Sequence, residues 1–265
     1  MHPMLHIAVK AARQAGNVIL RHQPQVDRLT VERKGLRDYV TEVDRRAEQE
    51  IIRVLRAAYP HHAILAEESG RQGDGPYCWV IDPLDGTTNY LHGYPQYAVS
   101  IALQHKGVTQ QAVIFDPVHN DLYTATRGGG AQLNDRRIRV SRVHRLADAL
   151  LATGFPLRVQ QHLKAWLGMF ADILPQTSGV RRGGSAALDL AFVASGRVEG
   201  FWEIGLKPWD MAAGCLLIEE AGGMVGDLLG GRRHLESGNV VCGNPDIYPL
   251  LLRLVAPHVT PALGR

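Results

Sequence analysis

Cysteine is scarce in this sequence of 265 residues: three are present, at positions 78, 215 and 242, and none stands in C-x-x-C spacing. An odd, sparse count argues against a disulfide framework or a zinc site and is typical of a reducing compartment. Apolar runs long enough to span a bilayer are missing as well. The first residues carry Lys10 and Arg13 inside their apolar pattern, where a signal peptide would have an uninterrupted apolar core. We therefore expect a cytoplasmic protein with no membrane partner.

An excess of one charge is also absent, because the formal net charge is only +3. Arginines gather within residues 136–145 and at 181–182 and 232–233, but such runs are usually solvated faces or ion-pair partners. They are too weak to predict a nucleic-acid partner by themselves. The length allows one large domain or two closely packed ones, which need no disulfide for stability.

The first half of the chain is predicted to hold two amphipathic helices followed by strands. Apolar residues recur every three or four positions from about Met4 to Arg21, which indicates the first helix. Thr41 and Asp44 have the spacing of a helix cap for the second, and Pro60 ends it. Short apolar runs then predict largely antiparallel strands at residues 63–66, 77–81, 97–104, 111–115 and 122–126.

The second half alternates between strands and helices. Strands are predicted at residues 150–153, 198–203, 224–226 and 240–242, and helices at residues 160–173, 185–194, 208–221 and 246–255. Such alternation is typical of an α/β layer packed on the first, α+β layer. We expect two subdomains that share one interface, an α+β unit of residues 1–145 and an α/β unit of residues 146–265.

Acidic residues stand where predicted strands end or helices begin. Asp82 and Asp85 flank Pro83, which fixes the turn, so both carboxylates and the carbonyl of Leu84 can face one side. Oxygen ligands in this arrangement suit Mg²⁺. Residues 86–88 then open a predicted helix whose free N–H groups can hold a phosphate.

Two further acids, Glu67 after an apolar strand and Asp210 at the start of an apolar helix, extend this pattern. Each has an ordinary explanation when taken alone. Asp-Pro and Asp-Gly are common turn dipeptides, Glu67 can be a solvated acid, and Asp210 can interact with a helix dipole. Their combination favours a metal site.

Long segments of the sequence resemble the inositol monophosphatase family. Residues 79–95, WVIDPLDGTTNYLHGYP, resemble the first signature of the family, and residues 209–223 resemble its second. The resemblance extends through residues 38–44, 67–69, 128–131 and 184–187 and so covers nearly the whole chain. Residues 181–190 and 196–200 are most similar to the bacterial SuhB-like branch.

The resemblance implies a fold and an activity. The fold is a layered α-β-α-β-α sandwich, of mixed α+β and α/β character, that usually forms a homodimer. The activity is Mg²⁺-dependent, lithium-sensitive hydrolysis of a small phosphomonoester, with myo-inositol 1-phosphate as the first candidate. Sugar bisphosphates, histidinol phosphate and adenosine bisphosphates remain alternatives. The SuhB-like branch also implies a second, non-catalytic role with RNA polymerase and antitermination factors.

The resemblance further implies two to three Mg²⁺ ions and their ligands. Glu67, Asp82 and the carbonyl of Leu84 would hold the ion that activates water. Asp82, Asp85 and Asp210 would hold a second ion near the leaving oxygen, and a third, weaker ion would join near Glu67. Paired metals suit phosphoryl transfer, which asks a protein mainly for positioning and charge neutralisation.

The remaining roles also follow from the resemblance. Thr87, paired with Asp44, would orient the attacking water, and the N–H groups of Gly86 and Thr87 would hold the phosphate. The contacts to the substrate would come from Asp85, Gly184, Ser185, Ala186, Glu203 and Asp210. Lys34 lies in the loop that relatives use to approach the metals, but as a lone lysine it is better explained as solvated. Lys207 could tune the choice of substrate or merely face solvent.

Overall fold

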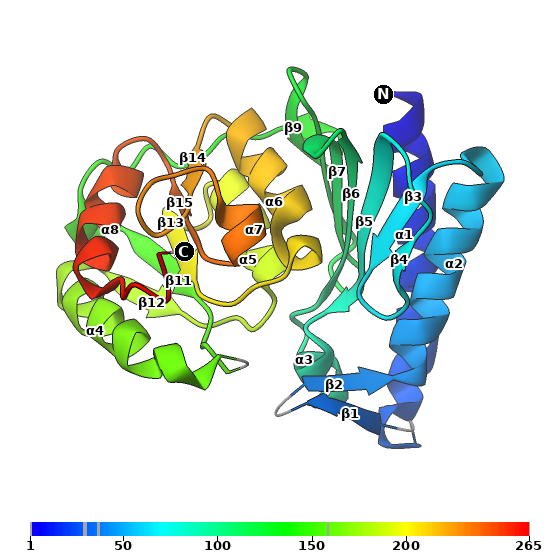
Figure 1. Ribbon diagram of the computed structural model, residues 1–265, viewed down its shortest axis with the longest axis horizontal. Coiled ribbons are helices and arrows are strands. Elements are labelled where there is room, and N and C mark those ends of the chain that lie inside the picture. The colour runs from blue at the N-terminus through cyan, green and yellow to red at the C-terminus, as the bar shows by residue number, and fades with distance from the viewer. Residues whose placement is uncertain (1, 29–30, 36–37, 158, 265) are drawn as a thin grey trace.

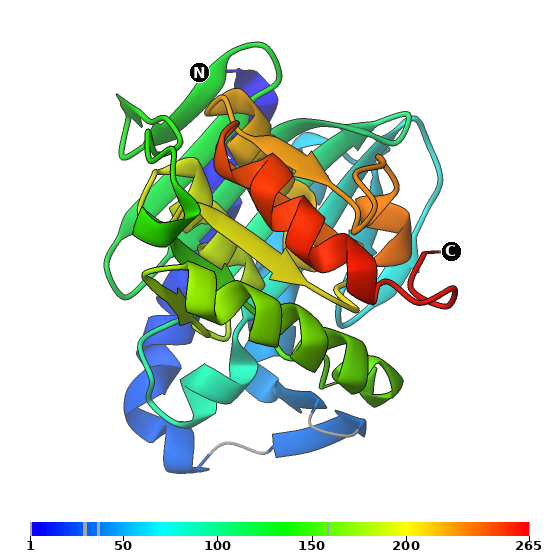
Figure 2. The same ribbon diagram turned by 90° about the vertical axis from the view of Figure 1, so that its left-hand side faces the viewer.

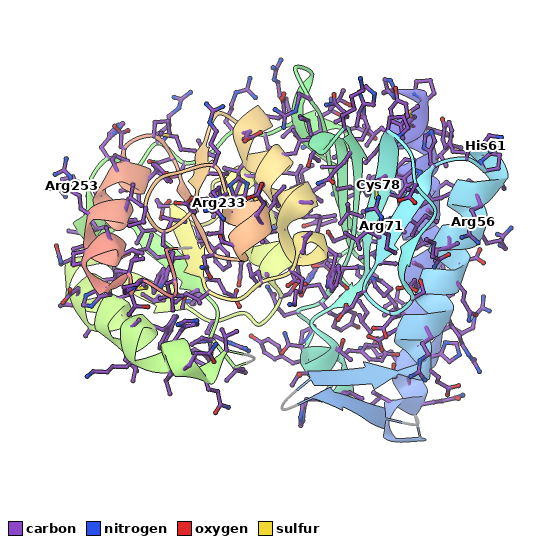
Figure 3. All side chains as sticks on the ribbon, viewed as in Figure 1. Arg56, His61, Arg71, Cys78, Arg233 and Arg253 are labelled. Atoms are coloured by element: carbon purple, nitrogen blue, oxygen red, sulfur yellow. The ribbon has the colours of Figure 1, made fainter. Side chains whose placement is uncertain are left out.

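The computed structural model describes the backbone of residues 2–28, 31–35, 38–157 and 159–264, and the side chains of these residues apart from 27–40. Two sheets and three helical layers stack in the order α-β-α-β-α, which confirms the predicted sandwich (Figure 1). The side chains on these layers are drawn in Figure 3, where half-buried Cys78 is labelled; all three cysteines are free thiols.

The larger sheet has eight strands in the order β10-β9-β8-β7-β6-β5-β3-β4, and only β3 and β5 run parallel. Its strands are β3 (Ala63–Ala66), β4 (Gly70–Gln72), β5 (Tyr77–Asp85), β6 (Ala98–His105), β7 (Val108–Asp116), β8 (Asp121–Thr126), β9 (Gly130–Leu133) and β10 (Arg136–Arg137). The short helix α3 (Thr87–Leu91) follows β5 directly.

Helices α1 (Pro3–His22) and α2 (Glu42–Ala58) cover the outer face of this sheet, joined through the hairpin of β1 (Val31–Gly35) and β2 (Asp38–Thr41). Helix α2 begins with a capping box. The Thr41 hydroxyl oxygen accepts from the N–H of Asp44, whose carboxylate accepts from the N–H of Thr41 at 2.8 Å. The predicted cap is therefore confirmed, and Asp44 lies buried in the first turn.

The smaller sheet has five strands in the order β12-β11-β13-β15-β14. Strand β11 runs parallel to β12 and β13, and β15 runs antiparallel to β13 and β14. The strands are β11 (Leu150–Thr153), β12 (Gly179–Arg181), β13 (Gly200–Glu203), β14 (Met224–Gly226) and β15 (Val240–Gly243). Helices α4 (Leu163–Ile173) and α8 (Ile247–Val255) cover its outer face, as Figure 2 shows.

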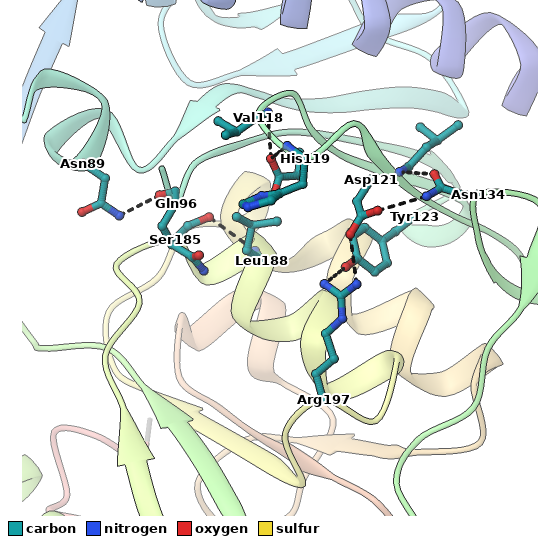
Figure 4. A network of polar contacts seen from close by, with 12 residues as sticks. Asn89, Gln96, Val118, His119, Asp121, Tyr123, Asn134, Ser185, Leu188 and Arg197 are labelled. Carbon is teal, nitrogen blue, oxygen red and sulfur yellow. Dashed lines mark hydrogen bonds and ion pairs between the residues drawn. The ribbon is translucent and has the colours of Figure 1, made fainter. Parts of the chain in front are cut away.

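Helices α5 (Ala186–Ala194) and α6 (Pro208–Glu220) lie between the two sheets. One continuous core joins the inner face of the larger sheet, both helices and the inner face of the smaller sheet. The loop after α5 adds a polar connection, because the Arg197 guanidinium donates to the Tyr123 hydroxyl at 2.7 Å and to Asp121 at 3.0 Å (Figure 4). Residues after position 145 thus pack directly on the sheet built before it.

Several local predictions need correction. Strand β4 and helix α7 (His234–Ser237) were not predicted, because three or four residues are too few to show a period. Strand β5 continues beyond residue 81 to Asp85, with an irregularity in its pairing with β6 between Asp82 and Asp85. No helix in the described part of the chain is both long and apolar enough to cross a bilayer.

Candidate functional site

Three carboxylates from two distant parts of the chain meet between the larger sheet and the middle helices. Each of Asp82, Asp85 and Asp210 offers one oxygen, and these oxygens all lie within 4.8 Å of one another. Asp82 and Asp85 come from the irregular end of β5, and Asp210 comes from the first turn of α6. The fold therefore brings two of the three predicted acidic segments into one cluster.

Backbone groups hold these carboxylates in place. The N–H of Leu84 donates to Asp82 Oδ1 at 3.0 Å, and the N–H of Lys207 donates to Asp210 Oδ2 at 2.7 Å. Asp85 Oδ2 accepts from the hydroxyl of Ser185 at 2.6 Å and from the N–H of Ala187 at 2.7 Å. The N-terminus of α5 thus holds the end of β5, although the two segments are 100 residues apart in the sequence.

Glu67 is placed by the turn after β3. Its N–H donates to the carbonyl of Ile81 on β5 at 3.1 Å. The carboxylate of Glu48 on α2 accepts from the N–H groups of Glu68 at 2.8 Å and Ser69 at 2.9 Å. The outer helix layer therefore fixes the loop that carries Glu67 toward the carboxylate cluster.

A cavity of about 340 Å³ opens over the cluster. It is lined by every predicted site residue except Asp44, together with Gly154, Phe155, Arg182 and Asp189. The predicted members are Glu67, Asp82, Leu84, Asp85, Gly86, Thr87, Gly184, Ser185, Ala186, Glu203 and Asp210. Lys207 is exposed and does not line the cavity, and the side chain of Lys34 lies outside the described residues.

Asp44 lies behind the cavity and reaches it through Thr87. The Thr87 hydroxyl is 2.9 Å from Asp44 Oδ1 and 3.1 Å from the carbonyl oxygen of Leu84. The other oxygen of Asp44 accepts from the Thr41 hydroxyl at 2.5 Å and from the Thr41 N–H. The Thr87 hydroxyl has one proton, which it donates to Asp44 Oδ1 or to the carbonyl oxygen of Leu84. The lone pairs of its oxygen stay available to accept from a donor in the cavity.

Residues 1–260 match the sequence profile described as the Inositol monophosphatase family. The chain belongs to this family. Phosphomonoester hydrolysis, the activity predicted from the sequence, is the reaction for which the family is named. The family is generally metal-dependent, which agrees with a cluster made only of oxygen ligands.

Individual relatives are similar over their full lengths. A Pseudomonas aeruginosa protein named Nus factor SuhB is 53% identical, and the alignment covers all of both chains. The crystal structure of extragenic suppressor protein suhB from Bartonella henselae has a TM-score of 0.94 at 43% identity, over 97% of this chain and 100% of that one. An inositol monophosphatase from Anabaena has a TM-score of 0.86 at 40% identity, over 98% of each chain.

The carboxylates of the site would repel one another less with a cation bound between them. Burial raises the pKa of the Asp82 carboxyl well above its usual range, and the carboxylates of Glu67, Asp85 and Asp210 raise it further. The donor set contains neither sulfur nor imidazole, so it fits a hard divalent ion better than zinc or copper. Asp82, Asp85 and Asp210 are thus suited to hold a hard divalent cation.

Glycine is required at position 86, between the cluster and α3. Its φ is +97°, and a Cβ there would lie 2.8 Å from the carbonyl oxygen of Gln96. The side-chain amide of Asn89 donates to that same oxygen at 2.7 Å and to the carbonyl of Gly183 at 2.9 Å. Figure 4 shows the contact between Asn89 and Gln96. The start of α3 is therefore tied to the loop that precedes α5.

Sequence reasoning missed Asp189, which lies on the cavity wall. Asp189 stands four residues after Ser185, so both lie on one face of the start of α5. That spacing was a signal available in the sequence. It was not used because Asp189 follows a run of apolar residues and has the ordinary place of an acid near a helix N-terminus.

Proposed function

We propose that this protein is a Mg²⁺-dependent inositol-1-monophosphatase, which transfers the phosphoryl group of a small polyol monophosphate to water. The observation that carries the proposal is the meeting of Asp82, Asp85 and Asp210 at one end of a cavity, in a chain of the inositol monophosphatase family. A cation relieves the repulsion within such a cluster of like charges, and paired cations clamp both reacting oxygens of a phosphate.

The proposed metal ligands divide into two sets. Glu67, Asp82 and the carbonyl oxygen of Leu84 would hold one Mg²⁺, and Asp82, Asp85 and Asp210 would hold a second. A third, weaker ion would use Glu67. Mg²⁺ supplies an activated water and neutralises charge on the phosphate and the leaving oxygen. The protein fixes the ligands through the backbone N–H groups of Leu84, Ala187 and Lys207.

Thr87 and Asp44 are the proposed orienting pair for the attacking water. Asp44 is buried and accepts a hydrogen bond from the Thr87 hydroxyl. The lone pairs of the Thr87 oxygen are therefore left to accept a hydrogen bond from that water. The N–H groups of Gly86 and Thr87 are the proposed phosphate donors. No side chain need form a covalent intermediate, because the chemistry depends on position and charge.

The proposed contacts to the alcohol come from Gly184, Ser185, Ala186 and Glu203, together with Asp85 and Asp210. All of them line the same cavity. Other small phosphates remain alternatives, namely sugar bisphosphates, histidinol phosphate and adenosine bisphosphates. Phosphate release from a panel of these compounds and myo-inositol 1-phosphate tests the proposal. We expect the inositol phosphate to give the highest kcat/KM.

The same assay tests the metal. Excess EDTA should abolish phosphate release, Mg²⁺ should restore it, and Li⁺ at submillimolar to millimolar concentration should inhibit it. Full activity in EDTA would reject the metal mechanism.

Light scattering at micromolar concentration tests the homodimer that family resemblance implies, and a monomer would count against it.

A second function is favoured by one comparison. The relative from Pseudomonas aeruginosa, 53% identical over both full chains, is named a Nus factor. We propose that this chain also binds the transcription antitermination machinery. A pull-down with RNA polymerase and Nus factors tests this, with the Asp210→Asn variant alongside. Retention by both forms would separate binding from catalysis, and retention by neither would reject the second function.

A further inference from the structure

The cavity has a second acidic wall beyond the metal cluster. Asp189 and Glu203 both line it. Of the carboxylates that raise the pKa of Glu203, Asp189 has the largest effect, ahead of Asp210 and Asp85. Asp189 and Glu203 are therefore neighbours. They lie on α5 and β13, whereas two of the three clustered carboxylates lie on β5.

The carboxylate of Asp189 reaches the cavity, and its oxygens are not among the fully enclosed unpaired atoms. Its residue is 3% exposed, and no described residue gives it a hydrogen bond or an ion pair. The exposed Arg182 acts on it only at longer range, and the Arg182 guanidinium lies 4.8 Å from the centre of the Phe155 ring. Buried polar groups are nearly always hydrogen-bonded, and burial of an unpaired carboxylate is costly. Because Asp189 lines the cavity, the missing partner is expected from a ligand.

Two glycines leave room for the acidic wall. A Cβ on Gly183 would lie 2.9 Å from Asp189 Oδ1, and a Cβ on Gly154 would lie 1.9 Å from the carboxyl carbon of Glu203. Any other residue at Gly154 would displace the Glu203 carboxylate. The chain thus keeps both acids clear of neighbouring side chains at the place where the alcohol part of a substrate would lie.

We propose that Asp189 is a specificity-determining residue that accepts a hydrogen bond from a hydroxyl of the leaving alcohol. This rests on the proposed function and extends it to a residue outside the predicted set. Burial, and then the charge of Asp85, raises the pKa of the Asp189 carboxyl. A carboxyl group can accept a hydrogen bond from a hydroxyl when ionised and donate one when protonated, so a hydroxyl is a suitable partner in either state. When ionised, Asp189 also adds negative charge beside Glu203, which disfavours a second phosphate at this wall, although Arg182 lines the same cavity. The wall therefore selects neutral polyol monophosphates over bisphosphates.

The test compares substrates that differ in their hydroxyl groups. Wild type, Asp189→Ala and Asp189→Asn are assayed on myo-inositol 1-phosphate, its monodeoxy analogues, phenyl phosphate and fructose 1,6-bisphosphate. Asp189→Ala should lower kcat/KM for the inositol phosphate about 10- to 100-fold, as loss of a hydrogen bond to a charged group would. Phenyl phosphate has no hydroxyl to lose, so its kcat/KM should change by less than about threefold.

Two further results are expected. One monodeoxy analogue should lose as much activity with wild type as Asp189→Ala loses with the full substrate, and the two losses should not add. In both variants, the ratio of kcat/KM for the bisphosphate to kcat/KM for the inositol phosphate should rise, because one repelling charge is gone. Glu199→Gln is the control, since Glu199 is a buried acid outside the cavity and accepts from the N–H of Leu150. It should leave the ratios between substrates unchanged.

Several outcomes would overturn the assignment. Equal losses on phenyl phosphate and inositol phosphate would make Asp189 a structural residue. A loss that high Mg²⁺ restores for every substrate would make it a cation ligand. If Asp189→Ala does not fold, the proposal is tested with Asp189→Asn and with wild type on the monodeoxy analogues. Equal kcat/KM of wild type on all of these analogues and on the full substrate would contradict the proposal. If another hydroxylated monophosphate is the preferred substrate, the proposal of an inositol phosphatase is wrong. The role of Asp189 is then tested by comparing the effect of Asp189→Ala on kcat/KM for that substrate and for phenyl phosphate.

Discussion

The hydroxyl of Thr87 lies 2.9 Å from Oδ1 of Asp44, across 43 positions of sequence. This contact joins α3 at the cavity to the first turn of α2 in the outer helix layer. Burial raises the pKa of the Asp44 carboxyl, while the hydrogen bonds from Thr41 and Thr87 lower it. Asp44 thus contacts the Thr87 hydroxyl at the cavity from the buried side, and we propose that the pair positions the attacking water.

Thr87→Ala should lower kcat far more than it changes KM or the Mg²⁺ dependence. The hydroxyl is assigned to the attacking water, so its loss removes a contact made in the transition state. Steady-state kinetics on the purified variant measure this. Thr87→Ser keeps the hydroxyl and should recover most of the turnover. Near-normal turnover in the alanine variant would reject the assignment.

Asp210→Asn should nearly abolish hydrolysis, because the proposed second metal loses an anionic ligand. Asparagine retains an amide oxygen that can accept from the N–H of Lys207, so the start of α6 should survive. The metal-free variant should melt no lower than wild type, because one repelling charge is removed. Mg²⁺ should stabilise wild type by thermal shift and the variant much less. A modest loss of stability with unchanged chemistry would instead identify Asp210 as a helix-terminal acid only.

Gly86→Ala should destabilise the fold more than Gly93→Ala. Both glycines have positive φ, +97° and +65°, so each substitution meets backbone strain of about 1–2 kcal/mol. Only at position 86 would the new Cβ also lie 2.8 Å from the carbonyl of Gln96, whereas no heavy atom lies within 4 Å at position 93. Each kcal/mol corresponds to about 2–4 °C of melting temperature in a chain of this size. Equal melting temperatures would contradict the close packing at Gly86.

The contribution of His62 to stability should be lost as the pH drops below about 6.5, the ordinary pKa of histidine. Burial, and then the charge of His61, lowers the pKa of His62, which stacks between Tyr59 and Tyr77. The unfolded chain then binds more protons than the folded chain below that pH, so acid favours unfolding. His62→Phe keeps the stack and should flatten the dependence of the unfolding free energy on pH, measured with urea between pH 8 and 5.5. Burial also lowers the pKa of His234, which should leave a residual slope.

The sequence predicted the main elements and the acids because each has a local signature. The cap at Thr41 and the turn at Pro83 depend on neighbouring residues only, and family resemblance supplied the order of the layers. The central place of α5 and α6 had a signal that went unused, since both helices are apolar on nearly every face and therefore suit burial between two sheets.

The acidic wall was harder to predict, because it depends on tertiary approach. Asp189 and Glu203 lie on different elements, and no spacing in the sequence relates a helix residue to a strand residue that packs beside it. Glycine is required at position 154 because the Glu203 carboxylate lies where a Cβ would be, which the sequence does not show. Such contacts are set by packing of the layers and are visible only once the layers are assembled.

The place of α6 between the sheets also has a consequence for synthesis on the ribosome. Chains grow from the N-terminus, so the eight-stranded sheet with Asp82 and Asp85 is complete well before Asp210 emerges. Until then the inner face of that sheet lacks α6 and exposes residues that are buried in the finished core. Nascent chains shorter than about 220 residues should therefore bind chaperones strongly and Mg²⁺ weakly, and both properties should reverse once α6 has docked.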